Sequence, residues 1–283
     1  MRSILSEIKK SLYPPLFILS CAQITLVCCL SEGYTSAGGR TYTIMELLLF
    51  LPRNGMFADI SLNRYDIWLR GAGTWSQLLF PFLVSTGYLY TIANEKLSGL
   101  NRLLLIRENN LRYGVSKLVS AMVSGGILLL AGYLCFGCLI YARFPSVYEY
   151  PMEKLNFYME IAPDFKELLF CLNRCGRIFL YGMCINVFAY LVAVFFRDKY
   201  ILGCLPLMLK YLWGQAVMKV ETDAVNKGNE AVLKLCSGFR PENILIPSDT
   251  WKMTLLLTGA LYLAGFCLTI HFLEKKGEGF GFE

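Results

Sequence analysis

Lys210 is the charged side chain whose sequence surroundings are the most apolar. It lies near the middle of the run 201–220. A lysine at the centre of a membrane-crossing helix costs at least about 2.5 to 3.5 kcal/mol unless it faces protein or water. Pro206, one turn earlier, frees a backbone carbonyl, and Gln215 follows five residues after the lysine. These residues are candidates for the polar lining of a transport pathway. Two structural alternatives stay open: the lysine reaches the membrane surface, or it bonds neighbouring carbonyls.

Residues that would support catalysis or metal binding are scarce. His271 is the only histidine in the sequence, whereas zinc sites of membrane metalloproteases use several. Cys135 and Cys138 form a C-x-x-C pair, but their apolar surroundings lack a nearby histidine or acidic residue. Packing is therefore favoured over redox or metal chemistry. Because no acidic residue lies inside a predicted span, an intramembrane enzyme is disfavoured.

The composition is typical of an integral membrane protein. Of the 283 residues, 55% are hydrophobic and 17% are charged, and the mean hydropathy is +0.48. We predict an all-α chain with one transmembrane domain over residues 1–283. Since a span needs roughly 20 apolar residues, about six spans are expected, at 14–30, 75–93, 119–141, 178–196, 201–220 and 253–272. Small residues would let the third span approach other helices closely, within the subunit or, as the second alternative, at an interface with another subunit. They are Ser120, Ala121, Ser124, Gly125, Gly126, Gly132 and Gly137.

Residues 1–13 are predicted to form an amphipathic helix on the inner membrane surface. One helical face is apolar and holds Ile4, Leu5, Ile8 and Leu12. The basic residues Arg2, Lys9 and Lys10 lie elsewhere on the helix. Pro14 and Pro15 then turn the chain into the first span. Because the apolar run is longer than a signal-peptide core, we expect this segment to be retained.

The positive charge indicates orientation rather than nucleic-acid binding. The formal net charge is +6, but the basic residues are scattered and mostly lie next to span ends. The short connections that share a side with the N-terminus are roughly twofold richer in Lys and Arg per residue than the long connections opposite. Both termini are therefore predicted to be cytoplasmic.

The long connections are predicted to lie outside. The apolar run 43–52 is too short to cross a membrane, so it either dips into the interface or forms a small helix in an external cap. Arg174 and Arg177 would bind anionic headgroups or an acidic substrate, or form ordinary salt bridges with Glu160, Asp164 or Glu167. Cys171, Cys175 and Cys236 are the candidates for a disulfide, and the sequence does not decide between pairings.

The segment 95–117 reads EKLSGLNRLLLIRENNLRYGVSK and joins the second and third predicted spans. Its leucines recur at roughly helical spacing, and basic residues lie between them. The residues concerned are Leu97, Leu100, Leu103, Leu104 and Leu111, with Lys96, Arg102, Arg107 and Arg112. This pattern predicts a cytoplasmic interfacial helix. A plain polar connector that carries orienting charges fits the periodicity equally well.

The same segment resembles the cytoplasmic segment of type-2 ABC transporter permeases. In that family an acidic and a basic residue are followed by a glycine, two leucines, a basic residue and a lysine that opens the third span. The matching residues here are Glu95, Lys96, Gly99, Leu103, Leu104, Arg112 and Lys117. Leu100 and Glu108 stand where the family often has threonine and proline. The inner-surface helix, the spans and the cytoplasmic ends also fit the family plan.

The resemblance implies an export permease for a peptide, lipid or drug-like substrate. The segment, including Arg107, would be a coupling helix that docks on a separate ATP-hydrolysing subunit. Two ATPase subunits that bind ATP and magnesium, and a second permease, identical or homologous, would complete the complex in a plasma membrane, usually bacterial. The sequence lacks the phosphate-binding pattern G-x-x-x-x-G-K-[ST], so ATP is expected on the partner.

A different class of function also fits the sequence. A non-transporting receptor or immunity component would use the same spans and bind an extracellular peptide through its outer loops, which total roughly 100 residues outside the predicted spans. Substrate movement that depends on a partner's ATP hydrolysis would distinguish the transporter from the receptor.

Overall fold

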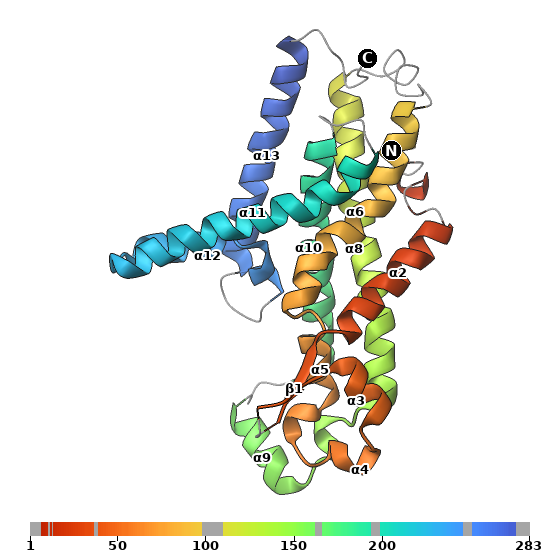
Figure 1. The fold of residues 1–283 in the computed structure, drawn as a ribbon, viewed down its shortest axis with the longest axis vertical. Coiled ribbons are helices and arrows are strands. Elements are labelled where there is room, and N and C mark those ends of the chain that lie inside the picture. Colours follow the sequence, from red (N-terminus) through yellow and green to blue (C-terminus); the bar gives the residue numbers. More distant parts are fainter. Residues whose placement is uncertain are drawn as a thin grey trace.

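The computed structural model describes residues 7–10, 12, 14–36, 39–97, 110–161, 166–193, 199–245 and 251–275. These residues are mostly helical, and long helices form a bundle that carries a group of short elements at one end (Figure 1). The long helices are α2 (Pro14–Cys29), α6 (Thr74–Leu97), α8 (Asn110–Arg143), α10 (Glu167–Ala193), α11 (Lys199–Asn226) and α13 (Trp251–Lys275). Residues 7–10 are also helical and precede α2.

The short elements form what we call the cap. They are β1 (Glu32–Thr35), β2 (Thr41–Thr43), α3 (Ile44–Phe50), α4 (Arg53–Met56), η1 (Ile60–Leu62), α5 (Arg64–Arg70), η2 (Val147–Glu149) and α9 (Met152–Ile161). The two strands pair antiparallel, with Thr35 opposite Thr41. This hairpin was not predicted from the sequence.

Among the residues that the structure describes, three helices have the length and hydropathy needed to cross a membrane. Their apolar segments are Tyr113–Glu149, Glu167–Leu191 and Trp251–Leu268, which overlap the predicted spans 119–141, 178–196 and 253–272. The other predicted spans, 14–30, 75–93 and 201–220, fall on α2, α6 and α11. The chain is therefore a mostly helical protein with the features of a multi-pass membrane protein.

Glycines set the close approach of α8 and α10 at the centre of the bundle. A Cβ atom on Gly182 would lie 2.7 Å from the carbonyl oxygen of Gly125. At the same level the side-chain amide of Asn186 donates a hydrogen bond of 2.6 Å to the carbonyl oxygen of Ala121. Small residues thus bring two backbones close enough for a polar contact between helices. The prediction that these residues pack within the subunit is confirmed.

The same principle brings α2 onto α8. A Cβ atom on Gly132 would lie 2.7 Å from the side chain of Ile24, which is fully buried. Thr25 donates a hydrogen bond of 3.0 Å to the carbonyl oxygen of Gly132. Large buried side chains fill the space around these contacts, among them Phe80, Leu129, Tyr133, Phe136 and Tyr181.

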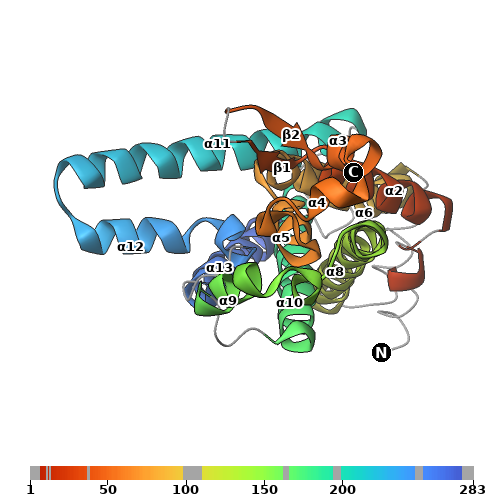
Figure 2. The same ribbon diagram turned by 90° about the horizontal axis from the view of Figure 1, so that it is seen from below.

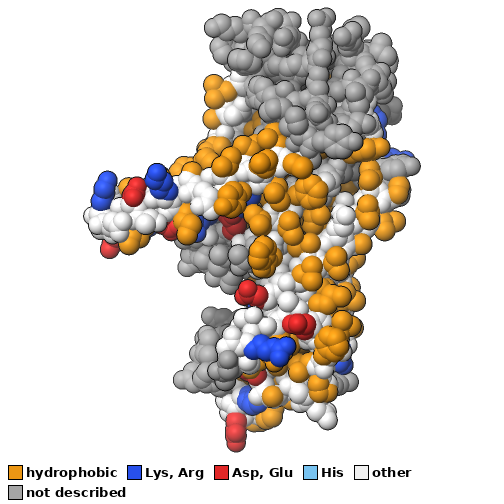
Figure 3. All heavy atoms as spheres, in the orientation of Figure 1, with side chains coloured by type: hydrophobic (Ala, Val, Ile, Leu, Met, Phe, Trp, Pro, Cys, Tyr) orange, Lys and Arg blue, Asp and Glu red, His pale blue; other side chains and the backbone are white. Residues whose placement is uncertain are grey.

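The helix α11 runs across the other long helices, and its C-terminal half projects from the bundle (Figures 1 and 2). Pro206 lies inside α11 without ending it. The helix α12 (Glu230–Gly238) folds back beside α11, and η3 (Pro241–Ile244) then leads the chain towards α13. Figure 3 shows charged side chains at the tip of this arm and on the cap, with mainly hydrophobic side chains over the bundle between them.

The apolar run 43–52 forms a small helix of the cap. Thr43 begins α3 with a capping box, because its hydroxyl accepts from the backbone of Glu46 and the Glu46 carboxylate accepts from the backbone of Thr43. Ile44 and Leu47 are buried, whereas Phe50 is 79% exposed. The run is thus a small helix with one face packed on the cap and an apolar face exposed, and its contact with a membrane interface stays a prediction.

Long basic side chains tie the cap together. Arg143 donates to the carbonyl oxygen of Leu51 at 2.8 Å, and Lys154 donates to that of Phe57 at 2.9 Å. Arg70 donates to the carbonyl oxygen of Gly33 at 2.6 Å. These bonds satisfy carbonyl groups that short helices and turns leave without a helical partner.

We predict that Gly182→Ala destabilises the protein, since the added methyl group would contact the α8 backbone. Overpacking of this kind costs typically about 1 to 3 kcal/mol. Gly176→Ala is the matched control, because it lies on the same helix and a Cβ atom added there would meet no neighbouring side chain within 4 Å. Thermal unfolding in detergent should show a lower midpoint for the first variant only. Equal midpoints would contradict the close contact.

Candidate functional site

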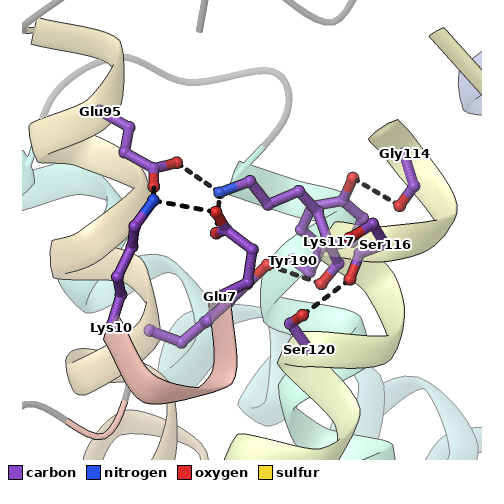
Figure 4. A network of polar contacts seen from close by, with 9 residues as sticks. Glu7, Lys10, Glu95, Gly114, Ser116, Lys117, Ser120 and Tyr190 are labelled. Carbon is purple, nitrogen blue, oxygen red and sulfur yellow. Dashed lines mark hydrogen bonds and ion pairs between the residues drawn. The ribbon is translucent and has the colours of Figure 1, made fainter. Parts of the chain in front are cut away.

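A buried charge cluster lies where the chain leaves α6 and enters α8. Glu95 is in the last turns of α6, and Lys117 is two turns into α8. Glu7 and Lys10 come from the helical residues 7–10. The four side chains point toward one another from three separate segments of the chain (Figure 4).

The cluster balances two carboxylates against two ammonium groups. Lys117 Nζ donates to Glu95 Oε2 at 2.5 Å and also contacts a carboxylate oxygen of Glu7. Lys10 Nζ lies 3.0 Å from Glu7 Oε1 and 3.5 Å from Glu95 Oε1. Glu7, Glu95 and Lys117 are only 7%, 6% and 3% exposed. Removing one member would therefore leave an uncompensated charge in a site with little water.

The pKa values in the N-terminal part reflect these contacts. Burial alone would raise the pKa of the Glu7 carboxyl, but the charges and hydrogen bonds of Lys117 and Lys10 outweigh burial and lower that pKa. Burial would lower the pKa of Lys10, but Glu7 and Glu95 outweigh it and raise that pKa. Both side chains are thus held in their charged forms.

Aromatic side chains surround the cluster and attach it to α6 and α10. Tyr88 donates a hydrogen bond of 2.7 Å to the carbonyl oxygen of Lys117, and Tyr190 donates one of 3.4 Å to that of Gly114. The Lys117 ammonium also lies 5.6 Å from the centre of the Tyr113 ring. The ends of α6, α8 and α10 are thereby joined at the cluster.

The predicted coupling residues divide into two groups. Glu95 is buried in the cluster, and Lys96 is in the last turn of α6. Arg112 is in the first turn of α8. The remaining predicted residues lie outside the described part of the chain: Gly99, Leu103, Leu104 and Arg107. The structure thus places the two ends of the segment, at Glu95 and Lys117, in direct contact.

Lys210 has a partner that the sequence did not reveal. Its ammonium group forms an ion pair with the carboxylate of Glu242 in η3, and its side chain is 12% exposed. Next to this pair, Arg240 pairs with Glu221 of α11. Both pairs connect α11 to the residues around η3. The lysine is therefore neutralised within the protein.

Lys210 also lines two adjoining cavities. A groove of about 490 Å³ lies along α11 and contains Gln215, Trp75 and Trp213 in its lining. A small apolar cavity of about 80 Å³ lies between α6, α10, α11 and α13, and it shares Lys210 and Trp213 with the groove. Pro206 is buried in α11 one turn before the lysine. Of the predicted pathway residues, Lys210 and Gln215 thus face a common groove.

Arg174 is structural in this fold. It is 4% exposed and donates to the carbonyl oxygens of Leu69, at 3.0 Å, and of Leu245. Its Nε also donates to the Tyr133 hydroxyl at 3.1 Å. Neither headgroup binding nor a salt bridge to Glu167 describes this residue, since Glu167 pairs with Arg64 at 2.6 Å.

Arg177 and Cys171 have local partners. Arg177 donates to the side-chain oxygen of Asn173 at 3.0 Å, and its guanidinium lies 5.3 Å from the Trp251 ring centre. Cys171 lies 3.0 Å from the Tyr141 hydroxyl. Among the residues that the structure describes, every cysteine is a free thiol, including Cys175 and Cys236.

Within the described ranges, no group of three or more His, Cys, Asp and Glu side chains could hold a metal ion. No family model, curated protein or solved structure matches the chain. The charge cluster and the groove are the features of the described residues that could carry a function.

Sequence reasoning missed Glu7 and Glu242. Glu7 is the only acidic residue within residues 1–13, and Lys10 follows it at helical spacing, which is a usable signal for a local pair. Nothing in the sequence indicates that Lys117, which is 110 residues away, completes the pair. Glu242 is likewise brought to Lys210 only by the fold.

We predict that Lys117→Met destabilises the protein by about 3 to 5 kcal/mol, because Glu7 and Glu95 would lose their shared partner. Adding Glu95→Gln should restore part of the loss, since Lys10 still compensates Glu7. Lys252→Met, at an exposed lysine of α13, is the control. Thermal unfolding in detergent gives the stability of each variant, including Glu95→Gln alone. If the destabilisation of the double variant equals the sum of the two single destabilisations, the two side chains are not coupled and the cluster is contradicted.

The cluster should also make stability sensitive to acid. Because the pKa of Glu7 is lowered from 4.5 in the folded state, its contribution is complete above about pH 4.5 and is lost as the pH falls further. Lys10 has a raised pKa, so its contribution is lost only above about pH 10.5. We expect Glu7→Gln to reduce the fall in unfolding temperature between about pH 5 and about pH 3. An unchanged acid dependence would contradict this assignment.

Proposed function

We propose that this chain is the permease subunit of a type-2 ABC exporter, with six spans and cytoplasmic termini. The observation that supports the proposal is the buried cluster that joins both ends of the coupling segment 95–117. The cluster fixes the end of α6 and the start of α8 to each other and to the helical residues 7–10, so a displacement of either helix end would be passed to the other.

The proposed mechanism is alternating access. When the partner ATPases close on ATP, they push the coupling segment, and the Glu95–Lys117 contact passes the displacement to α6 and α8 together. The helix α8 packs tightly on α10 through Gly125 and Gly182, and α6 contacts α11. Displacement at the cluster would therefore reach the groove at Lys210.

The proposed complex contains two ATPase subunits and a second permease, identical or homologous. ATP and magnesium bind the ATPase subunits, so this chain is not itself the enzyme. The exported substrate belongs to the peptide, lipid or drug-like class. The setting is a plasma membrane, most commonly a bacterial one.

Affinity purification of the chain in mild detergent tests the proposal directly. We expect a stoichiometric ATPase to co-purify and the complex to hydrolyse ATP. If no ATPase is recovered under several gentle conditions, the proposal is wrong.

We predict that Leu103→Glu with Leu104→Glu abolishes recovery of the ATPase. The reason is that two charged side chains would replace the apolar surface proposed to dock on it. Leu103→Met with Leu104→Met is the matched control and should retain the partner, because volume and apolarity are kept. Size-exclusion chromatography checks that both variants are inserted and monodisperse. Normal recovery with the glutamate variant would remove the docking role from these residues.

The receptor alternative is favoured by one specific observation. The cap contains a cavity of about 540 Å³ lined by charged and aromatic residues, among them Tyr34, Arg40, Tyr42 and Asp59. A cavity of this size and mixed lining suits a peptide side chain. A complex that hydrolyses ATP but moves no substrate would favour this alternative.

A further inference from the structure

The groove along α11 presents charges of both signs beside aromatic surface. Lys210 and Arg240 provide the positive charges, and Glu242 and Glu221 provide the negative charges. Their side chains are between 12% and 38% exposed, so the pairs are accessible from the groove. In each pair the basic side chain could exchange its glutamate for an anionic group of a ligand, and the glutamate could contact a cationic group of the same ligand. No charge would then be left uncompensated.

Aromatic and apolar side chains form the other walls of the groove. Trp75 and Trp213 are 59% and 40% exposed, and Tyr211 is 55% exposed. Indole rings at the edge of an apolar layer bind cationic groups on their faces and also pack on acyl chains. The groove therefore suits a molecule that has a charged head and an apolar body.

The small cavity beyond Lys210, of about 80 Å³, has room for only a short part of the apolar body. Its lining includes Pro81, Phe188 and Leu261 and is almost entirely apolar. Figure 3 shows that the bundle face on which α11 lies is mainly hydrophobic. A ligand could thus enter from the lipid phase and keep its tail out of water throughout.

We propose that this groove binds an amphiphile with a zwitterionic head group, such as a single-chain phosphoethanolamine lipid. The anionic phosphate would contact Lys210 and Arg240, and the ammonium would contact Glu242 and the Trp213 face. The part of the tail next to the head group would enter the small cavity lined by Leu261, and the rest would lie along the apolar face of the bundle. That this molecule is the transported substrate rests on the proposed function, whereas its binding does not.

A peptide fits these walls less well. A peptide carries backbone donors and acceptors along its whole length, and buried polar groups without partners are costly. The cavity beyond Lys210 offers few polar atoms to satisfy them. A hydrocarbon chain has no such requirement.

The test uses the purified permease alone, in an uncharged glycoside detergent. The probes are lysophosphatidylethanolamine, lysophosphatidylglycerol, an alkyl trimethylammonium, free phosphoethanolamine and an amphipathic cationic peptide. Binding is measured as the dissociation constant from the change in tryptophan fluorescence, since Trp75 and Trp213 both line the groove. We expect the zwitterionic lysolipid to bind at least about tenfold more tightly than the other four, a difference of about 1.4 kcal/mol.

Three variants locate the site. Lys210→Met with Glu242→Gln removes one pair without leaving a lone charge and should weaken binding of the zwitterionic lysolipid about tenfold or more. Leu261→Trp fills the small apolar cavity and should weaken binding of the zwitterionic lysolipid. Lys219→Met, at an exposed lysine of the same helix, is the control and should bind as the unaltered protein does.

The proposal is overturned if all charged lysolipids bind equally, if free phosphoethanolamine competes as well as the lysolipid, if the peptide binds best, or if the variants match the control. These outcomes are separate from those of the purification experiment. An ATPase that co-purifies while the lysolipid fails to bind removes this inference alone. Lysolipid binding without any ATPase partner removes the proposed exporter and keeps the site.

Discussion

A charged group inside an apolar bundle must find its partner within the protein, and the structure is organised around this constraint. Water has little access there, so each buried charge costs free energy unless another part of the chain neutralises it. Lys117 has Glu7 and Glu95, and Lys210 has Glu242. Arg174 instead takes carbonyl oxygens and a tyrosine hydroxyl. Each partner set draws together segments that are distant in the sequence.

The positions of these charges divide the molecule into three levels. The Glu7–Lys117 cluster joins the helix ends that flank residues 98–109. The Lys210 pair joins α11 to the turn before α13, and Arg174 joins α10 to the cap. Between these levels the packing depends on glycines and large apolar side chains rather than on charge. The backbones approach closely at Gly182, whereas the Lys210 pair is partly exposed and is the contact that we propose exchanges partners.

The proposed exporter and the proposed amphiphile site use these two contacts differently. A push on the coupling segment requires a stiff route, which the cluster and the α8–α10 contact provide. Ligand exchange requires charges that can change partners, and the partly exposed pairs of the groove satisfy this requirement. A fully buried pair, such as Lys117 with Glu95, would hold its partner too firmly for such a role.

The sequence by itself determined the class of protein. Long apolar runs predict helices because only a helix satisfies its own backbone in lipid, and the third, fourth and last predicted spans coincide with helices able to cross a membrane. Small residues near Gly125 predicted close helix packing correctly. The tertiary structure decided the polar sites, because Glu7 with Lys117 and Lys210 with Glu242 join residues at separations that no local periodicity encodes. The tertiary structure also decided the cap hairpin and the course of α11, because both depend on packing against neighbouring elements rather than on local propensity.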